Sequence, residues 1–473
     1  MRGMTAYCWR ISRLTYSITG CIIGCMKLKI FIIILIIPLI CLASDTSRET
    51  LLQEVSGITG ADISNAKNNL QSLSLFDAFA LTVYNTEDLK IGSESYFQAI
   101  EKKRQAFGSF LPYLSFQGNY VLPASIKGSA PASSSGLSTG VSLYGRQNII
   151  TGLSEWGDYS LAGKDTELSK MQLSAMTNNL LFDVSTAYYS ILMLQDLYKT
   201  NNEILSLYKQ TRAEISRRTA IGRSRASDLS RIDTQIYQLE AQIKDIETNL
   251  ESAKMALSLL TGIDSYLLKD TFPFSEIPDV IERSDELLLK RPDVKFAGIM
   301  LEKANISHSA AIGGHLPNIY AQGAYSIYSR GPGNDYYIGI GVELPIFEGG
   351  STRAKIREAD SQKKAAELNL AKVKKEAKQD IIDSAMSVNS CKSQYDAYLK
   401  AYESAQKTYR AVMADYARDR VTVLDVLSSL TSLQSARNDF ERINLTRKLY
   451  RIKLGIAIFE YSGKNIRLLE GAK

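Results

Sequence analysis

The sequence is poor in the residues from which enzyme and metal sites are usually built. His308 and His315 are its only histidines, and their spacing of seven positions (315 − 308) is too little for a metal site. The sequence contains no phosphate-binding glycine loop, metal-ligand cluster or nucleophile elbow. We therefore expect a protein that is not an enzyme and that needs neither a cofactor nor a metal.

Cysteine and net charge are also scarce beyond the N-terminal region. Four of the five cysteines lie within the first 41 residues, so Cys391 is alone in the remainder and a disulfide framework within one chain is excluded. Residues 1–43 hold five basic residues and no acid, which leaves 51 basic (56 − 5) against 50 acidic residues. This near-neutral body gives no electrostatic reason to expect a nucleic-acid partner.

Long apolar runs are confined to the same N-terminal region. The run from Ile30 to Leu42 follows two lysines and ends in a small-residue cleavage pattern, which is typical of a secretory signal. We predict that residues 1–43 are a signal peptide, with Met26 as an alternative start of translation. Lipidation of Cys41 is a competing possibility, although the residue before it is not small.

No later segment reaches 18 consecutive apolar residues, so the sequence predicts no membrane-spanning helix after the signal. An exported chain of this kind is periplasmic, secreted, or part of an outer-membrane barrel.

A long internal repeat is the main positive feature. Residues of the first half recur in the second half at two spacings. Before a short polar stretch the spacing is 205 positions (316 − 111), and after it the spacing is 197 positions (349 − 152, 425 − 228). The pairs that define them are Leu111 with Leu316, Gly152 with Gly349, and Asp228 with Asp425. A unit of about 200 residues is longer than a solenoid repeat. We predict structural repeats at 44–262 and 284–460, joined by a linker at 263–283 and followed by a tail at 461–473.

The repeat carries long helices. A heptad seam with one extra four-residue step runs from Leu173 to Tyr208 and recurs 197 residues later, and such a step straightens a supercoil. Each long helix is predicted to begin after a glycine and to run for about 100 Å at 1.5 Å per residue. The helices expected are Gly152 to Gly222, Gly350 to Asp419, 226–260, 423–459, and the shorter 75–107 and 284–312.

Between the shorter and longer helices the apolar period changes from 3.6 to 2. The alternating runs are 113–121, 137–143, 319–325 and 336–344, which indicate two β-hairpins with polar loops. Soluble ribbons are one reading. Four strands cannot close a barrel alone, however, and open edges are excluded in lipid, so lipid-facing strands would require several chains to share one barrel.

Several short motifs add a resemblance to a known family. They are the paired Leu-Pro strand starts, the stretch Gly-Val-Glu-Leu-Pro-Ile-Phe-Glu-Gly-Gly at 341–350, and the segments 220–229 and 416–427 at the two helical turns. In order, spacing and duplication the mature sequence resembles the TolC-like outer-membrane efflux proteins, the outer membrane factors. A periplasmic coiled-coil scaffold or adhesin without a channel is the alternative.

The resemblance implies a mixed α and β membrane protein, in which three identical chains form a 12-stranded outer-membrane β-barrel continued by a periplasmic α-helical barrel. It implies a passive exit duct for an inner-membrane pump, in a tripartite efflux pump or a type I secretion system of a Gram-negative bacterium. The implied partners are a periplasmic adaptor, the pump and outer-membrane lipid.

The resemblance also implies that the two long-helix turns form the periplasmic entrance. The expected adaptor-docking residues are Gly222, Arg223, Arg225, Tyr416, Arg418, Asp419 and Arg420. The tip arginines suggest an ionic lock or a basic docking face, and ordinary exposed charge at helix ends is the alternative. Glycine favours the left-handed conformation of such a turn, and aspartate at 419 is among the next most tolerated residues.

Four further positions are implied in gating. Asp425 corresponds to an aspartate that rings the closed entrance, where clustered carboxylates favour cations. The family's second aspartate is Ser428 here, its latch arginine is Val421, and Asp228 stands where the partner of that arginine would be. We hypothesise that Asp228 or Asp425 instead pairs with a tip arginine, while a simple role at a helix start is the alternative.

Overall fold

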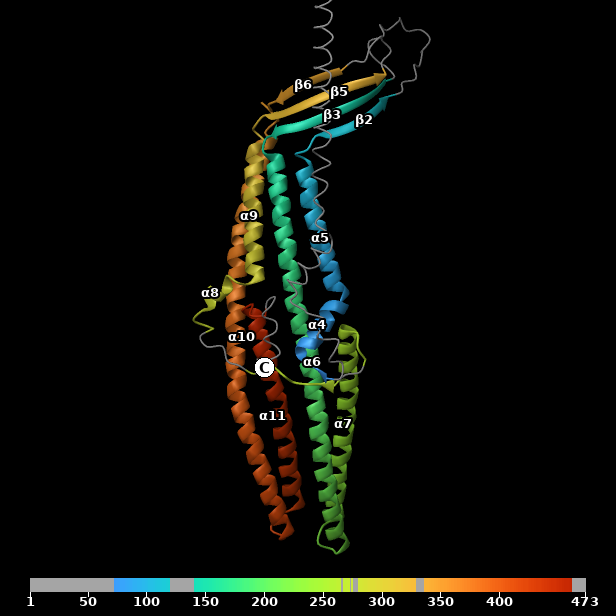
Figure 1. The fold of residues 1–473 in the computed structure, drawn as a ribbon. Coiled ribbons are helices and arrows are strands. Elements are labelled where there is room, and N and C mark those ends of the chain that lie inside the picture. The colour runs from blue at the N-terminus through green and yellow to red at the C-terminus, as the bar shows by residue number, and fades with distance from the viewer. Residues whose placement is uncertain are drawn as a thin grey trace, which may run out of the picture. The chain divides into compact units, whose positions relative to one another are not determined.

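The computed structural model describes residues 72–119, 140–264, 267–272, 274, 280–328 and 336–461 (Figure 1). The predicted signal peptide, Met26, Cys41 and all but the first residue of the predicted tail lie outside these residues. The described chain divides into a strand unit, with residues 107–149 and 319–341, and a helical unit that holds the remainder. These units draw on both halves of the sequence, and the division into two repeats stays a prediction.

The strand unit is a four-stranded sheet. Its strands are β2 (Tyr113–Asn119), β3 (Gly140–Thr151), β5 (Asn318–Tyr328) and β6 (Tyr336–Glu343), in the spatial order β2-β3-β5-β6. β2 and β3 are antiparallel, with Tyr113 opposite Arg146. Tyr144 of β3 lies 3.2 Å from the Gln322 side chain of β5, where its hydroxyl donates a hydrogen bond. β2 and β6 are the edge strands of this sheet.

The predicted second strand at 137–143 was wrong in its bounds, because β3 continues to Thr151. The sequence 144–148 is polar enough to resemble a loop, but these side chains find partners in the sheet. The Arg146 guanidinium lies 4.1 Å from the centre of the Tyr320 ring, and Gln147 donates to the Phe110 carbonyl at 2.6 Å. Pairing with β2 and these contacts therefore hold the polar segment extended.

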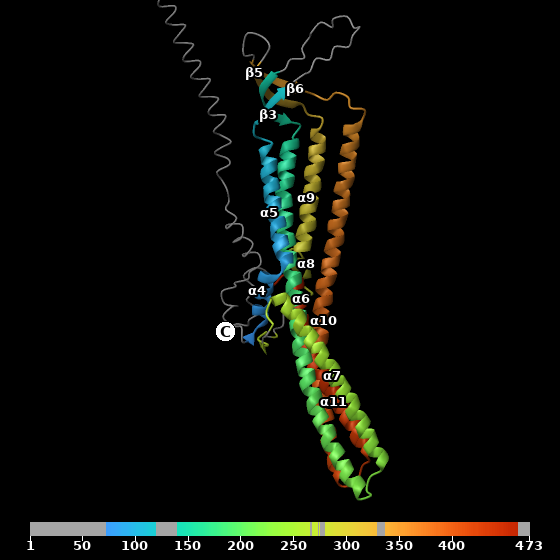
Figure 2. The same cartoon turned by 90° about the vertical axis from the view of Figure 1, so that its right-hand side faces the viewer.

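The helical unit contains two long helical hairpins. The first is α6 (Ser154–Ala220) followed by α7 (Ala226–Thr261), and the second is α10 (Ser351–Ala417) followed by α11 (Val423–Ala457). Figure 2 shows α6 and α7 side by side, and α10 and α11 pack against each other in the same way. α6 and α10 each have 67 residues, or about 100 Å. Their first residues, and their last, are 197 positions apart (351 − 154, 417 − 220), which confirms the predicted helix bounds.

Two predicted shorter helices are each broken. The segment 75–107 forms α4 (Leu75–Asn85) and α5 (Glu87–Gly108), with extended backbone at Thr86. The segment 284–312 forms α8 (Ser284–Leu288) and α9 (Pro292–Gly313). Arg291 has φ −64° and ψ 137°, because the ring of a following proline disfavours the helical region.

Short strands and helices cover the middle of the hairpins. β1 (Ser72–Leu73) pairs in parallel with β4 (Leu267–Leu268), and α9 packs against both α6 and α10. Tyr188 of α6 is fully buried, and its single hydroxyl proton is shared between the carbonyls of Lys269 at 2.7 Å and Leu73 at 3.0 Å. No helix among the described residues combines the length and apolar composition that a membrane crossing needs.

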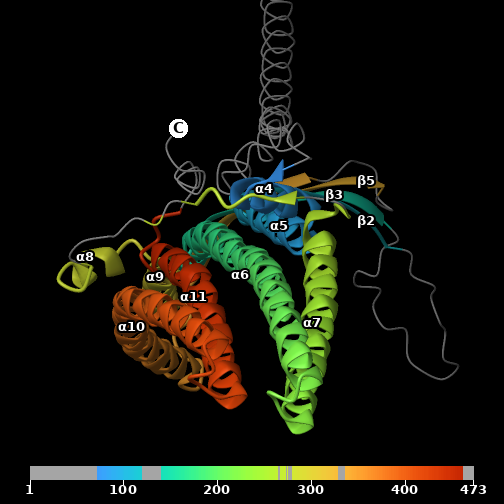
Figure 3. The same cartoon turned by 90° about the horizontal axis from the view of Figure 1, so that it is seen from below.

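A separate core lies between the hairpins on the side of their turns, and it positions the candidate site. It is built from buried aliphatic side chains of α6, α7 and α11 together with Tyr208 and Tyr416. Figure 3 shows α6 and α11 as neighbours from different hairpins. Polar contacts supplement this core, including an amide pair between Asn201 and Asn438 and the 3.1 Å contact between Tyr208 and Thr431. We call this layer the tip core.

Candidate functional site at the helical tips

Both hairpin turns use a left-handed residue, as the sequence predicted. Gly222 has φ +77° and Asp419 has φ +58°. The Arg223 amide donates to the Arg218 carbonyl at 2.8 Å, and the Arg420 amide donates to the Asp415 carbonyl at 3.0 Å. A side chain on Gly222 would meet nothing within 4 Å, so its backbone angle alone favours glycine there.

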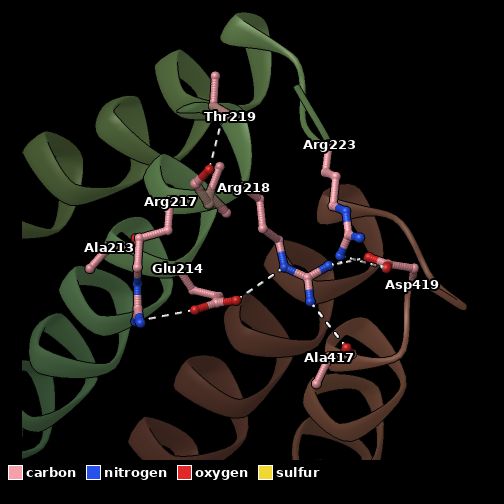
Figure 4. A network of polar contacts seen from close by, with 9 residues as sticks. Ala213, Glu214, Arg217, Arg218, Thr219, Arg223, Ala417 and Asp419 are labelled. Carbon is pink, nitrogen blue, oxygen red and sulfur yellow. Dashed lines mark hydrogen bonds and ion pairs between the residues drawn. The ribbon is translucent and has the colours of Figure 1, made fainter. Parts of the chain in front are cut away.

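One arginine joins the two turns. Arg218, in the last turn of α6, pairs with the Asp419 carboxylate and donates to the Ala417 carbonyl at 3.2 Å (Figure 4). Its Nε also donates to Glu214 at 3.1 Å. The Arg218 side chain is only 12 % exposed, whereas that of Asp419 is 55 % exposed. Two contacts of Arg218, with Asp419 and with the Ala417 carbonyl, therefore link the end of α6 to the α10–α11 turn, while Glu214 of the same helix supports the guanidinium. We call this group the tip clamp, made of Glu214, Arg218, Ala417 and Asp419.

Tyr416 forms the base of the tip clamp. The Arg218 guanidinium lies 4.3 Å from the centre of the Tyr416 ring, a cation–π contact. Burial lowers the pKa of Arg218, but the Glu214 hydrogen bond and the Asp419 charge outweigh it, so that this pKa is raised and the guanidinium keeps its charge. Tyr416 was predicted to belong to the docking surface. In the single chain it is 4 % exposed and part of the tip core, where its ring packs between Arg218 and aliphatic side chains, and its place in a docking surface stays a prediction.

Within one chain, Asp228 and Asp425 have the helix-start role that was the alternative to an ionic lock. Asp228 accepts from the Ser224 hydroxyl at 3.1 Å and the Arg225 amide at 3.2 Å. Asp425 accepts from the Thr422 amide at 2.8 Å and the Thr422 hydroxyl at 2.7 Å. Each carboxylate thus closes the first turn of the second helix of its hairpin, where negative charge is favourable.

Neither aspartate forms an ion pair with a tip arginine in the part of the chain that the structure describes. The Thr422 hydrogen bonds lower the pKa of Asp425. Within one chain capping occupies both carboxylates, and the hypothesis that Asp228 or Asp425 holds a tip arginine to shut a pore stays a prediction. The tip carboxylate that pairs with an arginine of the other hairpin is Asp419, and its partner is Arg218. The sequence did not point to Arg218 or to Glu214.

The other predicted tip residues are four arginines, two at each turn. Arg223, Arg225, Arg418 and Arg420 are all exposed around the turns. Arg223 approaches Asp419 at 3.8 Å and Arg420 approaches Asp415 at 3.8 Å. Within the described residues, no group of three or more histidine, cysteine, aspartate or glutamate side chains is arranged to hold a metal. The arrangement can therefore attract anionic groups and tie two hairpins together.

Comparison with known proteins shows where this arrangement belongs. Residues 284–454 match the family model described as outer membrane efflux protein. The chain is 21 % identical to the outer membrane protein TolC of Escherichia coli over 443 residues, which cover 88 % of each protein. It is 23 % identical to the cation efflux system protein CusC of the same species, over 79 % of this chain and 84 % of CusC.

The fold agrees with this match. The crystal structure of the outer membrane protein VceC of Vibrio cholerae superposes with a TM-score of 0.74 at 16 % identity, covering 82 % of this chain and 96 % of VceC. A structure of CusC superposes with a TM-score of 0.72 and covers 91 % of that chain. The chain is thus similar to the TolC-like outer-membrane efflux proteins in sequence over most of its length and in fold.

The names of these relatives indicate a broad class and a place. TolC is named an outer membrane protein, CusC a cation efflux system protein, and the matched family model an outer membrane efflux protein. In this TolC-like chain three of the four positions implied in gating lie at or just before the start of α11, and the fourth, Asp228, lies in the first turn of α7. Val421 packs against the tip core, whereas Asp425 and Ser428 share an exposed face one helical turn apart.

Proposed function

We propose that three copies of the chain form an outer-membrane channel that acts as a passive exit duct. The observation that carries the proposal is the four-stranded sheet with β2 and β6 as its edges. Backbone groups at such edges are not tolerated in lipid, and a single-chain bacterial barrel needs at least eight strands. Three sheets joined edge to edge supply 12 strands (3 × 4) and remove every edge.

The side chains of the edge strand suit this environment. β6 presents large apolar residues without charge until its last position, and Ile338 is 85 % exposed. Ile338, Ile340 and Val342 are two positions apart and therefore share one face of the strand. Exposed apolar surface of this extent is unusual for a soluble sheet and suits contact with lipid tails.

The long hairpins suit a conduit through the periplasm. Helices of about 100 Å exceed the thickness of a bilayer several-fold. Exposed apolar residues on α7 provide a face for neighbouring hairpins of other chains, and they are Tyr237, Met255 and Leu259. We propose that the four hairpin helices of each chain, α6, α7, α10 and α11, form a tube of twelve helices in the trimer (3 × 4). This tube would receive substrate from an inner-membrane pump through a periplasmic adaptor, in a tripartite efflux pump or a type I secretion system.

We further propose that the tips are the gate and that the tip clamp holds it shut. Opening by separation of the hairpins must break the contact between Arg218 and Asp419, because these residues come from different hairpins. Asp419 occupies a left-handed position that favours glycine. Its carboxylate offsets this conformational cost by engaging Arg218. An adaptor that binds the exposed side of the turns can then shift the balance towards the open state.

Fractionation and conductance test this function together. The protein should be recovered from the outer membrane as a heat-stable trimer that conducts ions across a planar bilayer. Recovery as a soluble monomer would support the periplasmic scaffold or adhesin instead. Loss of drug, metal or protein export in a deletion strain would then identify the transported class.

A further inference from the structure

We infer that a cavity where α11 ends and α9 begins is a binding site for a small uncharged ligand that combines an apolar ring system with an amide group. The cavity has a volume of about 260 Å³, and residues of α6, α9, α10 and α11 line it. An apolar cavity of about 150 Å³ holds benzene, so this one has room for two fused rings. It lies apart from the tip clamp, because Asn178 and Arg218 are 40 residues apart on α6 (218 − 178), or about 60 Å.

The cavity lies at a break between two helices. The α11 helix ends at Ala457, and α9 begins at Pro292. Arg291 joins the two ends, because its guanidinium donates to the Ala457 carbonyl at 3.0 Å and to Asp380 of α10 at 2.7 Å. A helix that is interrupted at this level leaves space between its neighbours, and both α6 and α10 line that space.

The charges that line the cavity balance. Arg291 and Lys453 are positive and Asp293 and Asp380 are negative, so the net charge is zero (2 − 2). Arg291 forms ion pairs with the two aspartates, at 2.8 Å with Asp293 and 2.7 Å with Asp380. Burial lowers the pKa of Arg291, but the hydrogen bonds with both aspartates outweigh it, so this pKa is raised and the guanidinium keeps its charge. A charged ligand would bring an uncompensated charge into this partly desolvated space, whereas an uncharged ligand would not.

Two asparagine side chains of α6 supply the polar recognition. Asn178 lines the cavity and is 9 % exposed. Neither Asn178 nor Asn179 has a side-chain hydrogen bond to another residue of the described chain. A buried amide without a partner costs free energy, and each such group calls for an explanation. Because an amide has both donors and an acceptor, the amide of a ligand can pair with Asn178 in both directions.

Apolar side chains from both hairpins complete the site. Phe182 of α6 and Ile456 of α11 line the same cavity and offer a surface for a ring system. The first hairpin thus contributes Asn178 and Phe182, and the second contributes Asp380 and Ile456. A bound ligand would contact both hairpins and favour the arrangement in which they are close together. This effect on opening rests on the proposed function, whereas binding itself does not.

A matched series of probes tests the site in the full-length protein. Naphthamide, naphthoate and naphthylmethylammonium share one ring system and differ in charge. Isothermal titration calorimetry in lipid nanodiscs should show that the uncharged amide binds about 5-fold more tightly than either ion. Ala175 lines the cavity, so Ala175→Phe should fill it and serve as the blank for probe that enters the lipid. Equal heats in the wild type and Ala175→Phe, or tighter binding of an ion, would overturn the inference.

Two asparagine variants test the recognition of the amide. Asn178→Leu keeps a side chain of similar volume and should weaken naphthamide binding about 3- to 10-fold. Asn202→Leu removes an amide from α6 outside the cavity, where Asn202 donates to the Tyr198 carbonyl at 2.8 Å, and should leave the affinity unchanged. No loss in Asn178→Leu, or an equal loss in both variants, would contradict the role of Asn178.

Conductance separates binding from its effect on opening. At ten times Kd, naphthamide should lower the ratio of open to closed Asp419→Asn channels about 10-fold, and it should have no such effect once Ala175→Phe is added. Binding without a change in this ratio would contradict the link to opening. A wild-type protein that fails to form a conducting trimer would contradict the proposed function itself, and the calorimetric result would still decide whether the cavity is a ligand site.

Discussion

Removal of the charge on Asp419 should open the channel without unfolding it. Asp419→Asn keeps a residue that tolerates the left-handed conformation at φ +58°. It also keeps an oxygen that can accept a hydrogen bond from Arg218. The substitution therefore isolates the ionic part of the tip clamp from the geometry of the turn.

The expected magnitude follows from exposure. The Arg218 side chain is 12 % exposed and that of Asp419 is 55 % exposed, so the pair lies between a screened surface pair and a buried one. We assign it about 1 kcal/mol per chain after allowing for this screening. Three independent copies would give about 3 kcal/mol in a trimer, which changes the ratio of open to closed channels by a factor on the order of 100.

Single-channel recording in planar bilayers measures this ratio. A double-mutant cycle with Asp419→Asn and Arg218→Gln should show coupling, so that the double variant opens little more than either single variant. The matched control is Asp233→Asn, which removes an ion pair with Arg212 that joins α6 to α7 within one hairpin. Equal opening in the control, or unchanged opening in Asp419→Asn, would refute the role of the tip clamp.

Four further outcomes follow from the described side chains. Ile232→Ala, in the tip core, should destabilise the helical unit by about 2–4 kcal/mol, measured by chemical denaturation followed by circular dichroism. Leu259→Glu, at an exposed position on α7, should shift the trimer towards monomer in size-exclusion chromatography while helix content stays unchanged. Burial raises the pKa values of Tyr188 and Tyr189, so their contribution to stability is complete below the usual value of 10 and declines as pH rises above it; thermal unfolding should therefore become easier above pH 10. Cys391 is buried and burial raises its pKa, so a thiol reagent should label it only after denaturation.

The helical hairpins were predictable from sequence because their signals are long and local. A seam repeated over many turns and glycines at both ends predicted α6 and α10, and both turns proved left-handed. The break before Pro292 was predictable in principle, since the residue before proline disfavours helix. The extension of β3 to Thr151 was not, because it depends on contacts of Arg146 and Gln147 with other segments.

The tip clamp shows the limit of reasoning along a single chain. The positions of Gly222 and Asp419 marked the turns, but Arg218 and Asp419 are 201 residues apart (419 − 218), and their pairing depends on how two hairpins pack. The capping roles of Asp228 and Asp425 had a local signal, a serine or threonine close before each aspartate. That signal favoured the helix-start alternative over the ionic lock.

The most direct test of the central claim is ion conductance by the protein purified from outer membranes. The account predicts a trimer that forms discrete channels in a planar bilayer and stays mostly closed until Asp419→Asn or the adaptor opens it. A pure, folded protein that stays monomeric, or that never conducts in either form, would contradict the claim that this chain builds an exit duct gated at its helical tips.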